Sequence, residues 1–207
     1  MFYLSKIPWF IKKVYPSCIW SMPLKEKKTI YLTFDDGPHP IATPFVLNEL
    51  SKYNAKATFF CIGDNVTQFP EIYNSVLQAG HSIGNHTFNH LNGGKTKTVD
   101  YINNISKAGE VINSKLFRPP YGRITAAQIR ALKKKLPIYK IIMWNVLSGD
   151  FDTTISVEKC WRNVEENLSD GSIVVFHDSE KAFRNLEYVL PKVLENFSQK
   201  GYSFEKL

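Results

Sequence analysis

Cysteines are few in this chain of 207 residues, and no stretch is apolar over any great length. The three cysteines, Cys18, Cys61 and Cys160, lie far apart and are odd in number, so they form neither a disulfide framework nor a CxxC metal pair. We expect three reduced, mostly buried thiols. Internal repeats, low-complexity segments and a glycine-rich phosphate loop are also missing, which favours a single ordinary domain.

The N-terminus lacks a long hydrophobic run as well. Met1–Trp20 is rich in aromatic residues but is interrupted by Pro8, Pro16, Lys12 and Lys13. Its apolar runs are too short for a signal peptide or a transmembrane span. The sequence therefore predicts a cytoplasmic location.

Residues 1–28 are interpreted as an N-terminal extension to a domain of residues 29–207. We expect the extension to pack on or beside that domain, as apolar side chains usually do. Because lysines accompany the aromatic residues of Phe2–Tyr15, peripheral attachment to a membrane surface is the alternative, although we do not expect it.

The net charge of +7 does not indicate a nucleic-acid partner. The lysines are spread along the chain, and the single run, Lys133–Lys135, ends a helical pattern at the end where cations are favourable. Net basicity suits a neutral or anionic polymer better than a cationic one. We expect a monomer that binds no nucleic acid.

Hydrophobic periodicity predicts alternating strands and helices. The predicted strands are Thr29–Phe34, Ala57–Ile62, His81–Gly84, Ile138–Val146, Ile173–Phe176 and Tyr202–Phe204. The predicted helices are Thr43–Tyr53, Phe69–Ala79, Val99–Leu116, Thr125–Leu136, Val157–Leu168 and Asn185–Lys200. This alternation indicates an α/β fold of parallel strands joined by crossovers, either an open doubly wound sheet or a closed barrel.

Ionisable side chains follow several of these strands directly. Asp35 and Asp36 follow the first strand, His86 the third and His177 the fifth, while Asp150 lies shortly after the fourth. Both barrels and doubly wound sheets place their active sites at the carboxyl ends of parallel strands. We therefore expect these side chains to meet in one site.

Asp35 and Asp36 are adjacent carboxylates between a strand and a Gly-Pro turn. Two nearby carboxylates repel unless a cation or a proton lies between them. His86 and His90 are four residues apart, so one helical turn would place both imidazoles on the same side, at a spacing that suits zinc. With Asp36 they would form a site of two histidines and one carboxylate, open to water and substrate.

A metal in such a site activates water and polarises a carbonyl oxygen, and the chemistry then needs a base and an acid. Asp35 and His177 are the candidates. Asp150 is suited to fix the tautomer of His177 and keep it protonated. Arg118 lies in a loop stiffened by two prolines, and an arginine near Asp35 would orient that carboxylate.

These segments, in this order, resemble the polysaccharide deacetylase family, also described as the NodB homology domain and carbohydrate esterase family 4. The matching segments are Thr33–Pro38, Gly84–His90 and Arg118–Gly122, with weaker matches at Trp144–Asp152 and Val175–Asp178. The combination is far more specific than any one segment. It covers roughly Thr29 to Leu207.

The resemblance implies a distorted, incomplete (β/α) barrel of about seven strands that removes N-acetyl groups from N-acetylhexosamine units of a glycan. It implies that Asp36, His86 and His90 bind a divalent metal, which we expect to be Zn²⁺, with Co²⁺ or another divalent ion as alternatives. Asp35 would then be the general base. A second set of residues would support it: Arg118 orients Asp35, the Tyr121 N–H stabilises the oxyanion, and His177, paired with Asp150, protonates the departing amine.

The chain departs from the family at two positions. Family members often carry Asp at the position of Leu147 and Trp at that of Phe151, both in the substrate groove, so these departures bear on the identity of the sugar. Family members that act on peptidoglycan, chitin or exopolysaccharide also usually carry a secretion signal or membrane anchor. An intracellular glycan precursor is therefore an alternative substrate.

Three other functions stay open. A site of two histidines and one carboxylate is also typical of non-haem iron oxygenases, although the order of the ligands and the βα alternation disfavour them. A carbohydrate-binding relative without catalysis is disfavoured because Asp35 and His177 are both present. Hydrolysis of another linear or cyclic amide on the same fold is the third alternative.

Overall fold

The computed structural model describes residues 4–207, so Phe2 of the predicted N-terminal apolar segment lies outside the described residues. The strands are β1 (Cys18–Ile19), β2 (Thr29–Asp35), β3 (Ala57–Cys61), β4 (Ser82–Asn85), β5 (Leu116–Phe117), β6 (Lys140–Ile142), β7 (Val146–Leu147), β8 (Ile173–His177) and β9 (Ser203–Phe204). The α-helices are α1 (Trp9–Val14), α2 (Ala42–Lys52), α3 (Gly63–Gln68), α4 (Pro70–Gln78), α5 (Thr98–Gly109), α6 (Ala126–Lys135), α7 (Val157–Glu165) and α8 (Phe183–Gln199). Short 3₁₀ helices occupy Gly93–Lys95 (η1), Pro120–Gly122 (η2) and Glu180–Ala182 (η3).

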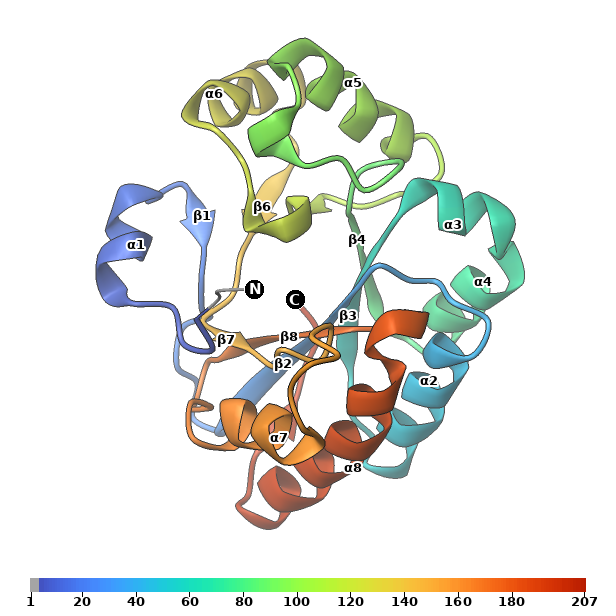
Figure 1. The fold of residues 1–207 in the computed structure, drawn as a ribbon, viewed down its shortest axis with the longest axis vertical. Coiled ribbons are helices and arrows are strands. Elements are labelled where there is room, and N and C mark those ends of the chain that lie inside the picture. Colours follow the sequence, from blue (N-terminus) through green and yellow to red (C-terminus); the bar gives the residue numbers. More distant parts are fainter. Residues whose placement is uncertain (1–3) are drawn as a thin grey trace.

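The strands form one curled parallel sheet surrounded by helices (Figure 1). Its order is β1-β6-β5-β4-β3-β2-β8-β7, and β9 pairs separately with β2. The prediction of a distorted, incomplete (β/α) barrel is confirmed. The described part has nine strands rather than about seven, because β1 and β5 have only two residues each and show no periodicity.

Strand β2 lies between β3 and β8 and is buried along its whole length. The ring of Phe34 stacks between Phe59 of β3 and Phe176 of β8, at centroid distances of 5.1 and 5.9 Å. Successive side chains of a strand face opposite sides, so Thr33 and Asp35 face the side opposite to Phe34. The outer side of β2 therefore packs on apolar side chains, while the inner side carries polar ones towards the site.

The stretch from β6 to β7 joins the two ends of the sheet. Strand β6 pairs with β5, whereas β7 pairs with β8, and the backbone changes partners between them. Within this stretch, Met143 N donates to Ile19 O and Asn145 N donates to Ile173 O. The prediction of one continuous strand over Ile138–Val146 is therefore wrong.

The N-terminal segment contacts both ends of the sheet. Lys6 forms an antiparallel bridge with Val146 of β7, and Leu147 N donates to Ser5 O at 2.8 Å. Further along the same segment, β1 pairs in parallel with β6. Residues before position 29 thus contribute backbone pairs to the gap in the barrel.

Two differences affect the helices. The predicted helix Val99–Leu116 ends at Gly109, because Ser114 donates to Ile83 O and accepts from Leu116 N, which directs the chain into β5. Helices α1 and α3 were not predicted. The three cysteines are free and buried, as expected. Among residues 4–207, no helix has the length and apolarity needed to cross a bilayer.

Candidate active site

The eight site residues predicted from the sequence lie at or just after the carboxyl ends of the strands. Asp35 ends β2 and Asp36 follows it, His86 and His90 follow β4, Arg118 and Tyr121 follow β5, Asp150 follows β7, and His177 ends β8. Direct contacts join them into three groups: Asp36 with His86 and His90, Asp35 with Arg118, and Asp150 with His177. The ring of Tyr121 contacts that of His90.

Asp36, His86 and His90 offer three ligand atoms for one metal ion. Asp36 Oδ1 lies 3.1 Å from His90 Nε2 and 3.7 Å from His86 Nε2. All three ligand atoms lie within 4.8 Å of one another. Asp36 Oδ1 is buried and accepts no hydrogen bond of good geometry from the described residues. A buried carboxylate oxygen facing two imidazole nitrogens is what a divalent cation requires.

The two histidines come together through a loop and not through a helical turn, so that part of the prediction is wrong. Thr87 and His90 have φ angles of 67° and 57°, and Asp36 has a φ of 82°. Side-chain hydrogen bonds replace the helical ones, since Thr87 N donates to Asn85 Oδ1 and Leu91 N donates to Thr87 Oγ1. Backbone strain of this kind often occurs at functional sites.

His86 is held by a second contact behind the ligand group. Its Nδ1 lies 2.9 Å from Arg118 O, so the proton on Nδ1 is donated to that carbonyl and Nε2 faces Asp36. Burial lowers the pKa of His86 to about 4, against the opposing charge of Asp35. The imidazole is therefore neutral at pH 7, which is the form that binds a metal.

Arg118 is fully buried and positions Asp35. Its Nη1 donates to Asp35 Oδ1 at 2.6 Å and to Thr33 Oγ1 at 2.7 Å, and its Nη2 donates to Met143 O at 3.1 Å. The guanidinium carbon also lies 4.0 Å from the ring centroid of Phe60. Because these contacts fix the arginine on several sides, they fix the carboxylate paired with it.

His177 and Asp150 form the third group. His177 Nδ1 lies 2.8 Å from Asp150 Oδ1, and His177 N donates to Asp150 Oδ2 at 2.7 Å. Ser148 Oγ also donates to Asp150 Oδ1. Burial favours the neutral ring, but the Asp150 carboxylate outweighs burial and raises the pKa of His177 to about 9. At neutral pH His177 is thus a cation that can donate a proton from Nε2.

Tyr121 lies in a strained turn beside the metal ligands. Its φ is 59°, its side chain is 54% exposed, and its ring centroid is 4.6 Å from that of His90. Gly122 N closes the turn by donating to Pro119 O. The ring therefore borders the open side of the ligand group.

Asp178 is a buried residue of the site that the sequence analysis did not single out. It accepts hydrogen bonds from Gly37 N at 3.1 Å and from Thr43 Oγ1 at 2.5 Å, and its own N donates to Asp35 O. Burial raises the pKa of its carboxyl group to about 8. A Cβ atom on Gly37 would lie 2.1 Å from Asp178 Oδ2, so only glycine fits there. Its one sequence signal is the position next to His177.

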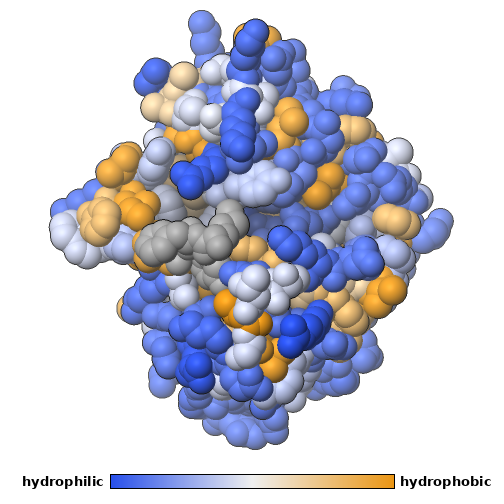
Figure 2. Space-filling model, viewed as in Figure 1, coloured by the Kyte–Doolittle hydropathy of each residue, from blue (hydrophilic) through white to orange (hydrophobic). Residues whose placement is uncertain are grey.

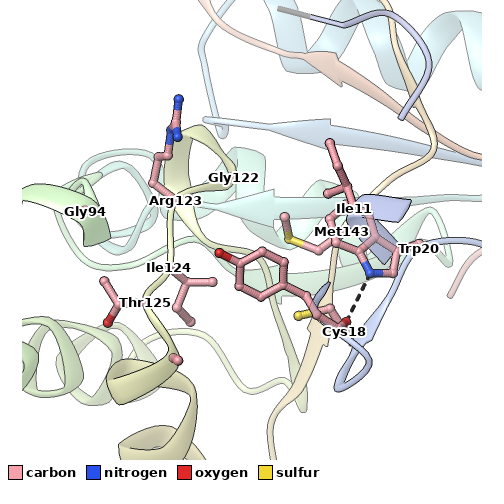
Figure 3. A pocket seen from close by; sticks show the side chains of 11 residues that line it. Ile11, Cys18, Trp20, Gly94, Gly122, Arg123, Ile124, Thr125 and Met143 are labelled. Carbon is pink, nitrogen blue, oxygen red and sulfur yellow. Dashed lines mark hydrogen bonds between the residues drawn. The ribbon is translucent and has the colours of Figure 1, made fainter. Parts of the chain in front are cut away.

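A cavity of about 510 Å³ lies beside the site, between the N-terminal segment and the loop that follows Tyr121 (Figure 3). Its walls include Ile11, Tyr15, Cys18, Trp20, Gly122, Ile124, Thr125 and Met143. Figure 3 shows the hydrogen bond from Trp20 Nε1 to Tyr15 O. None of the predicted metal ligands lines this cavity.

Comparisons with known proteins assign the chain to a protein family. The family profile described as polysaccharide deacetylase matches residues 24–139, which is more than half of the chain. The chain belongs to the polysaccharide deacetylase family. A peptidoglycan-N-acetylglucosamine deacetylase of Bacillus cereus is 36% identical over 191 residues, covering 89% of this chain and 88% of that protein. A chitooligosaccharide deacetylase of Azorhizobium caulinodans is 35% identical over 161 residues, covering 74% of this chain and 75% of that protein.

Solved structures of deacetylases have the same fold. The crystal structure of a peptidoglycan N-acetylglucosamine deacetylase in complex with 4-naphthalen-1-yl-N-oxidanyl-benzamide superimposes with a TM-score of 0.87 at 32% identity, covering 97% of this chain and 95% of that one. The protein described here is thus a polysaccharide deacetylase, a hydrolase of carbon–nitrogen amide bonds. Enzymes of this family depend on a metal ion, and the group formed by Asp36, His86 and His90 is suited to hold one.

Proposed function

We propose that this deacetylase removes the acetyl group from the nitrogen of N-acetylglucosamine units in a peptidoglycan-type glycan or its precursor. Two kinds of relative support this substrate, since those named above act on peptidoglycan N-acetylglucosamine and on chitooligosaccharide. Chitooligosaccharides are short chains of N-acetylglucosamine, so both substrates contain this sugar. The glycan and its length are the part of the proposal that goes beyond family membership.

One observation carries the proposal. Three metal-ligand atoms, a carboxylate held by a buried arginine, and a histidine kept protonated by a second carboxylate all lie at the same end of the barrel. Metal-assisted amide hydrolysis needs a metal site, a base and an acid, and here each is a separate group. A binding protein would not need the base or the acid.

Asp36, His86 and His90 would hold the ion, and their donor set of two nitrogens and one oxygen supports Zn²⁺. When bound, the ion supplies a Lewis acid for water and for the amide carbonyl. The orphaned Asp36 Oδ1 and the Nδ1 contact that aims His86 Nε2 into the site support this assignment. Co²⁺ and other divalent ions fit the same donors.

Asp35 would act as the general base that takes a proton from the attacking water. Arg118 holds one oxygen of this carboxylate through Nη1, which leaves the other oxygen for water. The Tyr121 N–H would donate to the oxygen of the former carbonyl as negative charge develops there. The left-handed backbone at Tyr121 fixes the direction of that N–H before substrate binds.

His177 would donate its proton to the departing sugar nitrogen. Its Nδ1–H is held by Asp150, so the proton that leaves is the one on Nε2. Asp150 itself stays a positioning residue, since its two oxygens bond His177 and the neighbouring loop. This pairing keeps His177 protonated at neutral pH, so that it can act as the acid.

Phe151 and Leu147 would shape the sugar site. The Phe151 ring meets the His177 ring edge to face at 5.1 Å, and Leu147 is almost completely buried. By the resemblance to the family, Phe151 and Leu147 stand where many members carry Trp and Asp. The present chain therefore offers a smaller, more apolar wall beside the acid.

The test is acetate release from a panel of substrates: N-acetylglucosamine oligomers, muropeptides, nucleotide- and lipid-linked N-acetylglucosamine, and small linear and cyclic amides. Each is assayed with the metal-free enzyme and after addition of Zn²⁺ or Co²⁺. We expect metal-dependent release from one or more of the sugar substrates and none from the small amides.

Each alternative gives a different result in the same panel. Release from the small amides alone identifies an amide hydrolase of different substrate class. Glycan binding without release, with one metal bound per chain, identifies a binding relative. Turnover of 2-oxoglutarate with Fe²⁺ would identify an oxygenase. Any of these three results contradicts the proposed function.

A further inference from the structure

Helix α1 exposes large apolar side chains. Trp9, Phe10 and Val14 are 67%, 55% and 68% exposed, and none of the six residues of α1 is buried. Figure 2 shows hydrophobic side chains gathered on the surface at the left of the view, over α1. A group of exposed apolar side chains on one short helix marks a contact surface more often than isolated ones do.

The helix has two different sides. Successive residues of a helix are about 100° apart, so Trp9, Phe10, Lys13 and Val14 fall within one half of the circumference. Ile11 falls on the opposite half and packs against the apolar cluster of the barrel. Lys13 Nζ lies 4.6 Å from the centroid of the Trp9 ring. The outward side therefore presents apolar side chains with an ammonium group among them.

The charged side chains of the segment that contains α1 are all positive. Residues 4–25 contain Lys6, Lys12, Lys13 and Lys25 and no aspartate or glutamate. Lys6 and Lys13 are exposed. A helix with aromatic and aliphatic side chains on one side and lysines beside them fits the headgroup region of an anionic bilayer. Tryptophan is enriched at that depth because its ring is amphipathic.

The helix is also fixed to the barrel on both sides. The Lys6–Val146 bridge precedes it, and the pairing of β1 with β6 follows it. A surface held in this way loses little conformational freedom on binding. Across the cavity of Figure 3, Ile11 of α1 faces Gly122, the neighbour of Tyr121.

We propose that α1 docks the protein on an anionic membrane surface, with Trp9, Phe10 and Val14 at the level of the headgroups and the lysines against the anionic lipids. Docking there holds the loop that carries Tyr121 close to the bilayer. This function is separate from catalysis, since no residue of the proposed active site takes part in it.

The test is sedimentation of the full chain with vesicles of phosphatidylcholine alone or mixed with phosphatidylglycerol. We expect binding to the mixed vesicles that weakens as salt is added. The W9S/F10S variant should lower the partition coefficient by about tenfold or more, because it removes the apolar contact. K6Q/K13Q, which removes the two exposed lysines, should lower it by about fivefold for each lysine at low salt.

The matched control is V99S/I138S, because these side chains are 60% and 58% exposed and lie outside α1. This variant should sediment like the unmodified chain. Sedimentation is measured without substrate, so its result does not depend on the proposed function. W9S/F10S should also have the same activity as the unmodified chain on soluble N-acetylglucosamine oligomers.

Two results would overturn the proposal. One is equal sedimentation of the unmodified chain and W9S/F10S, or no sedimentation of either. The other is a dimer in light scattering that W9S/F10S converts to a monomer without any vesicle binding, which would assign this face to a second copy of the chain. Vesicle binding by a monomer that W9S/F10S abolishes supports the proposal.

Discussion

The charge of His177 gives the sharpest prediction, made by replacing Asp150 with asparagine. The Asp150 carboxylate raises the pKa of His177 to about 9, against burial, from an ordinary value of 6.5. Without that charge, burial is opposed only by the smaller effects of Asp36 and Asp35, so the pKa in D150N should fall to about 6.5 or below. At pH 8 the protonated fraction then drops from about 90% to about 3%, which is a loss of about thirtyfold in the acid form.

The predicted effect on turnover depends on pH. At pH 6 His177 is mostly protonated in the unmodified enzyme and in D150N alike. The ratio of kcat in D150N to kcat in the unmodified enzyme should therefore be about twentyfold or more higher at pH 6 than at pH 8. Taking this ratio at each pH cancels changes in metal binding common to both proteins. Acetate release under saturating substrate measures it, and NMR titration of the His177 ring checks the pKa directly.

The same shift affects stability. Folding raises the pKa of His177, so its contribution is fully present below pH 6.5 and is lost as the pH rises through about 9. The shift corresponds to about 3 kcal/mol of unfolding free energy. The control is D152N, which neutralises a carboxylate in the same loop. Its kcat relative to that of the unmodified enzyme should not depend on pH. A constant ratio for D150N from pH 6 to 8 would refute the assigned role of Asp150.

Three further predictions follow from the site. R118A leaves the buried Asp35 carboxylate unpaired, so the unfolding free energy measured by urea denaturation should fall by about 3–5 kcal/mol. A decrease below about 1 kcal/mol would contradict the role of this pair. Zn²⁺ at a hundred times its dissociation constant should raise Tm by about 5–10 °C in the unmodified chain and not in D36N; an equal rise in both proteins would place the metal elsewhere. D178A removes the acceptor of Gly37 N and Thr43 Oγ1 and should weaken the zinc affinity measured by titration. The control D170A removes the acceptor of Thr29 N, away from the site. It should destabilise the fold without changing the zinc affinity.

The barrel and the six predicted strand regions could be derived from the sequence because those runs are apolar over several residues. The predicted strand ends also placed the candidate residues that follow them at one end of the sheet, which is where they lie in the structure. Strand β5 could not be predicted, since Leu116 and Phe117 pair with residues of β4 and β6 that are distant in sequence. The same holds for β1, whose partner Ile141 is more than a hundred residues away from Cys18.

Some details of the site could not be predicted, for a different reason. The spacing of His86 and His90 indicated neighbouring imidazoles, and their ring centroids lie 5.2 Å apart. The helical turn was wrong because Thr87 and His90 adopt left-handed backbone angles without being glycine. Such conformations depend on side-chain hydrogen bonds, here from Asn85 and Thr87. Asp178 was missed because its importance lies in contacts with Gly37 and Thr43, which no spacing reveals.

The exposure of α1 also could not be derived from composition. Its aromatic and aliphatic residues were expected to pack on the domain, as most such residues do. Ile11 does so, whereas Trp9, Phe10 and Val14 face outwards, because a short helix lying on a barrel has only one side to bury.

The most direct test of the central claim is acetate release from N-acetylglucosamine oligomers and muropeptides by the unmodified enzyme and D35N, each with its bound metal measured. The proposed division of roles predicts one metal per chain in both proteins, release by the unmodified enzyme, and a rate in D35N lower by about 10²–10⁴-fold. Loss of metal from D35N would make Asp35 a ligand and not the base. Undiminished release by D35N, or no release by the metal-loaded unmodified enzyme from any glycan tested, would contradict the account.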